Sequence, residues 1–310
     1  MLWMILGIAV AVAALVLLTA YICFQKTFAA QRRKLKDGEF DVPVGKMYEP
    51  YREKVIGWVQ EVRALPHRAY TVTSFDGLKL HGKFYEYQPG APVELMFHGY
   101  RGTPERDLPS GVQRCFKANR SAFVVEQRAS GSSEGNVISF GIHERRDCLT
   151  WIDLLIRELG PDAKIILTGL SMGAATVLMA AGEELPANVV GVLADCGYSS
   201  AREIICKEIR AMGLPPKLVY PFVKFSAKLF GRFDLEETSP EEAVKNCKIP
   251  VIFYHGESDE YVPCYMSKRN YDACASRKQL VTIPGAGHGL CYAVDPQRYL
   301  DTLRTFFSEV

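Results

Sequence analysis

Short apolar runs recur from residue 93 onward, and most of them are followed by a segment whose apolar residues have helical spacing. Apolar runs without polar alternation are typical of strands covered on both faces, and strands that alternate with helices build a mostly parallel sheet. The expected strands are Val93–Phe97, Ser121–Val125, Lys164–Thr168, Val189–Ala194, Pro250–Tyr254 and Leu280–Ile283. The expected helices are Pro104–Ala118, Gly141–Leu159, Met172–Leu185, Pro263–Ala275 and Asp295–Phe307. This pattern predicts an α/β domain with helices flanking the sheet.

A helix and a hairpin are predicted ahead of the first of these runs. Apolar residues have helical spacing over Tyr51–Leu65, and two alternating stretches within Tyr70–Tyr85 flank the turn residues Asp76-Gly77. Residues 25–50 are basic, then mixed, and have no core pattern of their own. We therefore expect a linker over residues 25–50 and the folded domain over residues 51–310.

The first 24 residues carry no charged side chain and consist mainly of Leu, Ile, Val and Ala. At about 1.5 Å per residue, a helix of this length crosses a hydrocarbon core of roughly 30 Å. A cleaved signal peptide would carry basic residues ahead of a shorter apolar run, and no Lys or Arg precedes this one. We predict an uncleaved membrane anchor over residues 1–24. The alternative is a helix buried in the protein core.

The charge distribution predicts the orientation of this anchor. Basic residues directly follow the apolar run, so the positive-inside rule places the C-terminal domain in the cytoplasm. The nine cysteines are odd in number and form no C-x-x-C pair, which fits reduced thiols in a cytosolic domain. The net charge of +2 gives no basic field for nucleic acid. The flanking basic residues are Lys26, Arg32, Arg33, Lys34 and Lys36.

About fifty residues between Cys196 and Lys248 lack a strong strand signal. Long insertions of this kind are usually functional, and this one mixes apolar and aromatic residues with Lys217, Lys224 and Lys228. We expect a helical cap insertion over about residues 197–247. A helix pair packed on the domain and a contact with the membrane surface are the alternatives.

Gly169-Leu170-Ser171-Met172-Gly173 lies between a predicted strand and a predicted helix. Two glycines let the chain make a cramped strand-to-helix turn that exposes the serine, and a helix N-terminus favours developing negative charge. A serine hydroxyl needs a base and an oxyanion site to act as a nucleophile. The sequence therefore predicts Ser171 as a nucleophile.

Three further segments supply what this serine needs. His98-Gly99-Tyr100 ends the first core strand, and the backbone N–H groups of Tyr100 and Met172 are the expected oxyanion hole. One of the acids between Glu257 and Glu260 follows another strand and would orient a base. His288 lies in a glycine-rich loop after the last strand, where it would accept the serine proton.

Taken together, these motifs resemble the α/β-hydrolase superfamily from about residue 70 to the C-terminus. The resemblance is greatest to bacterial membrane-anchored members related to serine aminopeptidases and cinnamoyl-type esterases. It implies that Asp259 is the acid of a Ser171–Asp259–His288 triad, and that an eight-stranded sheet carries its insert after the sixth strand. One loop departs from the family pattern, because Glu126 and Ala129 stand where relatives commonly have Asp and Gly.

The expected reaction is acyl transfer to water through an acyl-enzyme, with a carboxylic ester as substrate. No metal or organic cofactor is expected, because no cluster of His, Cys and Asp ligands is apparent in the sequence. An aminopeptidase, or another amide or thioester hydrolase, is the alternative, and the acidic stretch Asp234–Glu242 would then hold a substrate amine. A non-catalytic scaffold of the same fold is the third hypothesis. The sequence does not predict the oligomeric state.

Overall fold

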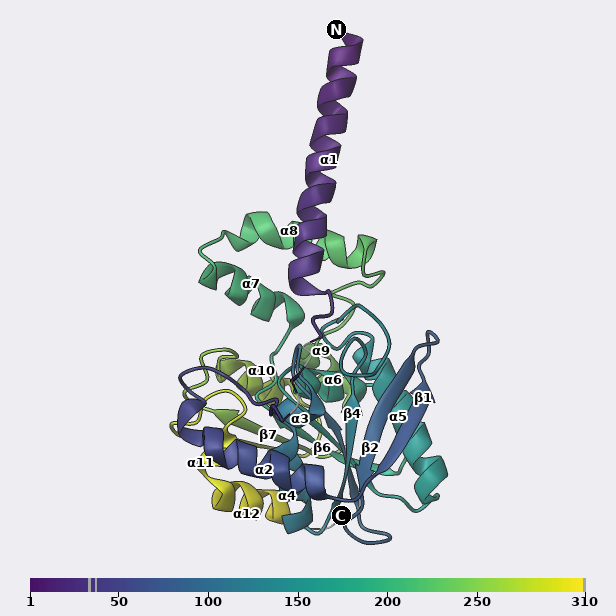
Figure 1. The fold of residues 1–310 in the computed structure, drawn as a ribbon, viewed down its shortest axis with the longest axis vertical. Helices are drawn as coiled ribbons and strands as arrows, with labels where there is room; N and C mark the ends of the chain where they lie inside the picture. The colour runs from purple at the N-terminus through teal and green to yellow at the C-terminus, as the bar shows by residue number, and fades with distance from the viewer. Residues whose placement is uncertain (33–34, 37, 309–310) are drawn as a thin grey trace.

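The computed structural model describes residues 1–32, 35–36 and 38–308. Eight strands form one sheet in the order β1-β2-β4-β3-β5-β6-β7-β8, in which β3 to β8 are parallel and β1 and β2 are antiparallel (Figure 1). This is the predicted mostly parallel, eight-stranded sheet. The strands are β1 (Arg68–Thr73), β2 (Lys79–Tyr85), β3 (Val93–Phe97), β4 (Ser121–Glu126), β5 (Ile165–Leu170), β6 (Val189–Asp195), β7 (Val251–Gly256) and β8 (Lys278–Ile283).

Helices cover both faces of the sheet, because every second side chain of a buried strand points to the opposite face. Leu95 and Leu167 pack on one face with Trp151. Ile166 and Ile252 belong to a second cluster on the other face. The first face carries α5 (Glu144–Leu159), α6 (Met172–Ala180) and α10 (Tyr265–Ala273), and the second carries α2 (Arg52–Ala64), α4 (Pro109–Lys117), α11 (Cys291–Val294) and α12 (Pro296–Phe306).

One predicted helix is divided in two. The segment Pro104–Ala118 forms α3 (Pro104–Asp107) and α4, with a break at Leu108. Pro109 has no N–H to donate, and its ring disfavours helical dihedrals at the preceding residue, so a new helix begins there. Prolines at the first position are otherwise compatible with helices.

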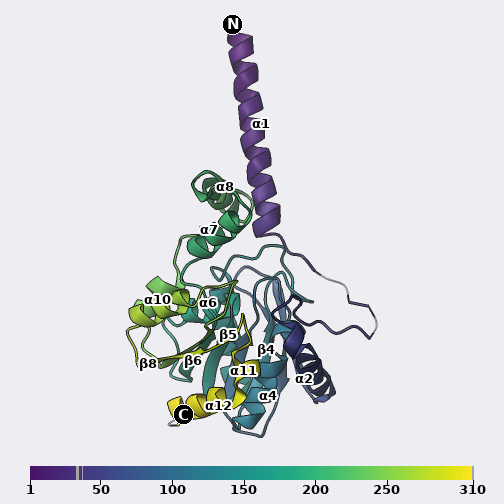
Figure 2. The ribbon, with the colours of Figure 1, turned by 90° about the vertical axis from the view of Figure 1, so that its left-hand side faces the viewer.

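The apolar N-terminal run forms α1 (Leu2–Thr27), which extends away from the sheet (Figures 1 and 2). Only 6% of the most apolar 18-residue stretch of this helix is buried, so the alternative of a core helix is wrong. The helix is long and apolar enough to cross a membrane. Its last turns are different, because Ala20, Phe24 and Phe28 are buried against the rest of the protein. Of the basic residues that predict orientation, Arg33 and Lys34 lie outside the described residues, as do residues 309 and 310 of the expected domain.

The insertion follows β6, the sixth strand, as the resemblance implied. It contains α7 (Ala201–Ala211), α8 (Pro216–Leu229) and α9 (Pro240–Ala243). Figures 1 and 2 show α7 and α8 above the body of the domain and beside the lower end of α1, with α8 lying across the base of α1. The insertion is therefore a helix pair that both covers the domain and contacts α1.

Candidate active site

Ser171 lies at the turn between β5 and α6, where the sequence places it. Its backbone has φ +56° and ψ −115°, a left-handed conformation that is strained for a residue with a side chain. A Cβ atom on Gly169 would lie 2.1 Å from the carbonyl oxygen of Gly173, and one on Gly173 would lie 2.0 Å from that of Phe97. Both glycines are therefore required by the close approach of β3, β5 and α6.

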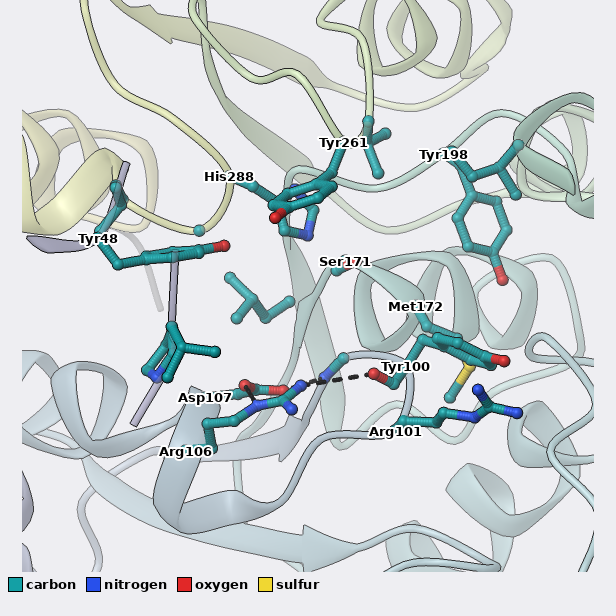
Figure 3. Close-up of a pocket in the computed structure, with 18 of the residues that line it drawn as sticks. Tyr48, Tyr100, Arg101, Arg106, Asp107, Ser171, Met172, Tyr198, Tyr261 and His288 are labelled. Atoms are coloured by element: carbon teal, nitrogen blue, oxygen red, sulfur yellow. Dashed lines mark hydrogen bonds and ion pairs between the residues drawn. The ribbon is translucent and has the colours of Figure 1, made fainter. Parts of the chain in front are cut away.

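Asp259 and His288 come together from loops that follow β7 and β8. The Nδ1 atom of His288 donates to Oδ2 of Asp259 over 2.7 Å, and the imidazole ring lines the same cavity as Ser171 (Figure 3). The other carboxylate oxygen of Asp259 accepts from the backbone N–H groups of Tyr261 (2.9 Å) and Val262 (2.8 Å). With Nδ1 occupied, Nε2 is the nitrogen left to exchange a proton.

A second histidine, His255 at the end of β7, also contacts Asp259. Its Nε2 atom lies 2.8 Å from the carbonyl oxygen of Val262 and 3.3 Å from Oδ2 of Asp259, and its Nδ1 lies 2.6 Å from the hydroxyl of Ser267. Burial opposes ionisation of Asp259, but hydrogen bonds from His255 and His288 outweigh it and hold the pKa of Asp259 well below its usual range. The contact of His255 with Asp259 was not predicted, although the two residues are only four positions apart in His255-Gly256-Glu257-Ser258-Asp259.

Tyr100 and Met172 both line the cavity with Ser171 (Figure 3). Within the described part of the chain, neither amide donates a hydrogen bond to another protein group. Met172 is the first residue of α6, and first-turn amides have no partner inside their helix. Two residues that line the cavity thus have backbone donors without a protein partner among the described residues.

Asp107 holds the loop that carries Tyr100. Its Oδ2 accepts from the N–H of Gly99 at 2.8 Å, and its Oδ1 accepts from Arg106 at 2.9 Å. A Cβ atom on Gly102 would lie 2.0 Å from this carboxylate, so the loop closes tightly around it. Sequence reasoning did not single out Asp107, because nothing in its local pattern shows which amide it meets.

The His98 side chain is buried and structural, as expected. Its Nε2 accepts from the N–H of Gln127 at 3.1 Å, and its Nδ1 donates to the carbonyl of Gly99 at 2.9 Å. Burial lowers the pKa of His98, which keeps the ring neutral. Glu126, in the loop that departs from the family pattern, accepts from the N–H of Ser132 and does not line the cavity.

The end of α1 is bound to the loop that carries Tyr100, one of the two backbone donors. The hydroxyl of Tyr100 donates to the carbonyl of Thr27 at 2.8 Å, and the guanidinium of Arg101 donates to those of Lys26 (2.9 Å) and Ala29 (3.2 Å). A cation at a helix C-terminus also interacts favourably with the helix dipole. The apolar helix is therefore structurally continuous with the candidate site.

The cavity beside Ser171 has a volume of about 510 Å³ and is mainly apolar. Ile204, Ile205 and Ile209 of α7 line it from the insertion, so the insertion covers the pocket, as the cap interpretation expects. None of the acidic stretch Asp234–Glu242 lines it. Within that stretch Glu236, Glu237, Glu241 and Glu242 form ion pairs with Lys224, Arg145, Arg269 and Lys245, respectively. The stretch is thus not positioned to hold a substrate amine.

Cys196 lies close to Asp259 and His288 and, among the described residues, forms with them a group of potential metal ligands. Its sulfur, a carboxylate oxygen of Asp259 and a nitrogen of His288 all lie within 4.8 Å of one another. Burial raises the pKa of Cys196 well above its ordinary value, which favours the neutral thiol. The short Asp259–His288 hydrogen bond uses two of these three donors, so their arrangement fits a hydrogen-bonded pair without a metal.

No family model matches the chain. A curated relative, the uncharacterized protein YqkD of Bacillus subtilis, is 27% identical over 191 residues, which cover 61% of this chain and 63% of that protein. Among solved structures, the Pyrococcus furiosus esterase Pf2001 is 18% identical with a TM-score of 0.65, covering 87% of this chain and 97% of the esterase. A Mycobacterium tuberculosis puromycin-hydrolyzing peptidase is 20% identical with a TM-score of 0.62, covering 79% of this chain and 39% of the peptidase. These likenesses, with the strand order and the serine turn, show that the chain has the α/β-hydrolase fold.

Proposed function

We propose that this protein is a serine hydrolase that cleaves carboxylic esters through an acyl-enzyme. The observation that carries the proposal is the strained Ser171 at the end of β5, which lines one cavity with a histidine bound to a buried carboxylate. Nucleophile elbows of this kind expose a serine at the carboxyl edge of an α/β-hydrolase sheet. The shared fold with an esterase supports the reaction class.

In this mechanism Ser171 attacks the ester carbonyl while Nε2 of His288 takes the hydroxyl proton. The N–H groups of Tyr100 and Met172 stabilise the negative oxygen of the tetrahedral intermediate. His288 then donates the proton to the leaving alcohol, and a water molecule repeats the sequence on the acyl-enzyme. Asp259 stays ionised, fixes the ring orientation and stabilises the imidazolium.

An ester is favoured over a peptide because of the groups that line the cavity. The α7 side presents isoleucines, and the acids that line it already have cationic partners: Asp107 pairs with Arg106 and Glu208 with Lys207. Aminopeptidase activity is the second candidate, because Glu208 of the insertion lines the cavity and could exchange its Lys207 partner for a substrate amine.

Active-site labelling tests the nucleophile. A fluorophosphonate probe is expected to label the full-length protein, and Ser171→Ala is expected to abolish the labelling. Ser110→Ala is the matched control, because Ser110 lines the same cavity and should leave labelling intact. Absence of labelling in the wild-type protein would favour the scaffold hypothesis.

A panel of p-nitrophenyl esters and aminoacyl-anilides tests the substrate class. Turnover of esters with little or no anilide cleavage is the expected result. Anilide turnover without ester turnover would replace the esterase proposal with the aminopeptidase.

We also propose that α1 is an uncleaved single-pass anchor and that the catalytic domain lies in the cytoplasm. Phe24, in the last turn of α1, packs with Phe28, Phe140 and Phe233 in one buried cluster, so cleavage after α1 would remove Phe24 from the core. Lys26 and Arg32 follow the apolar segment, as the positive-inside rule requires of a cytoplasmic flank. Digestion of the domain by protease added to intact cells would contradict this orientation.

A further inference from the structure

The outward surface of α8 in the cap is apolar. Leu218, Phe225 and Leu229 are 68%, 44% and 43% exposed, and their spacing of seven and four residues places them on one stripe of the helix. Leu214, just before the helix, extends the stripe and is 47% exposed. Tyr220, Val223 and Ala227 on the opposite side are buried in the cap. The helix therefore has one apolar face turned inward and another turned outward.

The position of α8 along α1 relates this outward stripe to a membrane. Phe230, the residue that ends α8, packs on Tyr21 and Phe24 of α1, with ring centroids 5.6 Å apart in both cases. A hydrocarbon core of roughly 30 Å takes up about 20 helical residues, and so extends from Leu2 to about Tyr21. The first charged side chain of the chain, Lys26, follows one turn later. The crossing of α8 and α1 therefore coincides with the boundary between acyl chains and headgroups.

A row of lysines runs beside the apolar stripe. Lys217, Lys224 and Lys228 recur at intervals of seven and four residues on the flank between the outward stripe and the buried face. Lys224 pairs with Glu236, whereas Lys217 and Lys228 form no ion pair among the described residues. Helices that lie in the plane of a membrane interface combine an apolar face with lysines that meet anionic headgroups.

We propose that α8 lies in the headgroup–acyl boundary of the leaflet from which α1 emerges toward the domain. Leu229, the last residue of its stripe, adjoins Phe230, which packs on Tyr21 of the apolar helix that a membrane covers in the proposed anchored state. The flanking lysines favour anionic lipid over a second copy of this chain, since a copy would bring its own lysines to the contact.

This placement has a consequence for the substrate, which rests on the proposed hydrolase function. The cavity beside Ser171 is lined at its cap edge by Met212, 68% exposed at the end of α7, and by Lys26 at the end of α1. Lys26 follows the proposed membrane boundary by about one helical turn, and Met212 is two residues from Leu214 of the outward stripe. The cavity then opens at the lipid surface, and the substrate class is an acyl ester already dissolved in that leaflet.

Depth-dependent quenching tests the surface without relying on catalysis. The full chain, carrying Trp3→Phe to remove the tryptophan of α1, is placed in vesicles of brominated phosphatidylcholine and phosphatidylglycerol. Phe225→Trp in this background reports on the stripe. Tyr87→Trp is the control. The backbone N–H of Tyr87 donates a hydrogen bond to the hydroxyl of Ser121, at the amino end of β4 and away from the cap. Quenching at least threefold stronger at residue 225 than at residue 87 is expected, and equal quenching would overturn the proposal.

A kinetic comparison tests the consequence. Leu218→Asp/Phe225→Asp changes two residues that do not line the cavity. Turnover of a long-chain ester dispersed in vesicles is expected to fall about tenfold, with hydrolysis of soluble p-nitrophenyl butyrate and fluorophosphonate labelling unchanged. Equal loss on both substrates, or no loss on either, would overturn the membrane route. Absent labelling in the wild-type chain would instead count against the hydrolase, and the quenching result would stand by itself.

Discussion

The two sides of the cavity are lined by different kinds of residue, polar on the sheet side and mainly apolar on the cap side. The sheet side carries Ser171, His288 and the residues Tyr100 and Met172. Ser171 has a strained backbone conformation, His288 is hydrogen-bonded to Asp259, and the loop of Tyr100 is hydrogen-bonded to Asp107. The cap side is lined mainly by the isoleucines of α7, and the outer face of the same cap is exposed. Polar groups need fixed geometry to act chemically, whereas apolar contact needs only shape and area. Under the proposed function, the sheet side supplies the chemistry and the cap side selects the acyl group.

The largest expected effect on this comparison comes from the substitution Asp259→Asn. Loss of the carboxylate favours the wrong tautomer of His288, so kcat is expected to fall by about 10⁴-fold on every ester alike. Glu260→Gln is the control, because Glu260 is the adjacent acid and its side chain does not line the cavity. A loss that depends on ester chain length would contradict a purely chemical role for the sheet side.

The rigidity of the sheet side is tested by Glu94→Gln in β3. Glu94 is fully buried between Arg114 and Arg120, and removing one charge from such a cluster costs about 3–5 kcal/mol of unfolding free energy. Chemical denaturation at pH 7 measures this loss. Glu94→Asp, which keeps the charge, is expected to lose less.

The difference in unfolding free energy between wild type and Glu94→Gln should become smaller at low pH. Burial raises the pKa of Glu94, but the two arginines outweigh it and lower the pKa to about 2. A depressed pKa contributes stability above the unfolded-state value near 4.3, and this contribution is lost as pH falls toward 2. The gap is expected to shrink by about 2 kcal/mol between pH 5 and pH 3. If this difference in unfolding free energy did not change with pH, Glu94 would not be ionised in the folded protein.

Asp107→Asn tests how the loop of Tyr100 is held. An amide cannot accept from Gly99 and Arg106 with the strength of a carboxylate, so the loop donor is expected to move and kcat to fall roughly 10- to 100-fold. Because no substrate atom is bound by Asp107 in this mechanism, KM should change little. A rise in KM with constant kcat would assign Asp107 to substrate binding instead.

The smallest effect is expected on the cap side, from Ile209→Trp. The larger ring fills part of the cavity, so the ratio of long-chain to acetyl ester turnover should fall about tenfold while acetyl ester turnover stays the same. Ile209→Leu conserves the volume and should leave this ratio nearly unchanged. An equal loss on acetyl esters would remove the distinction between the two sides.

Local patterns predicted most of the fold. Six parallel strands were found because buried strands are short, apolar and β-branched, and the hairpin was found from its turn residues. The break at Leu108 was missed, although Pro109 was visible, because a helical pattern continues on both sides. Local motifs likewise singled out Ser171 and His288, and the family resemblance singled out Asp259; all three follow the carboxyl ends of strands at one edge of the sheet.

Other features depend on contacts that no periodic pattern in the sequence predicts, whether the partners are a few residues apart or far apart in the chain. The links of Asp107 to Gly99, His255 to Asp259 and Arg101 to the end of α1 leave no periodic trace, because a hydrogen bond depends on position in space. The acidic stretch Asp234–Glu242 illustrates the same limit, since its composition suited an amine site while its fold directs it to other ion pairs.

The sequence by itself determined the parallel sheet, the apolar first helix and the strand-to-helix turn at Ser171. These follow from side-chain periodicity and from the two glycines, which act within a few residues. Only the tertiary structure decided that α7 covers the cavity and that α8 crosses the base of α1, with its own apolar stripe exposed. Burial of an amphipathic helix does not specify its partner, so the position of the cap depends on which apolar surfaces the rest of the chain leaves open.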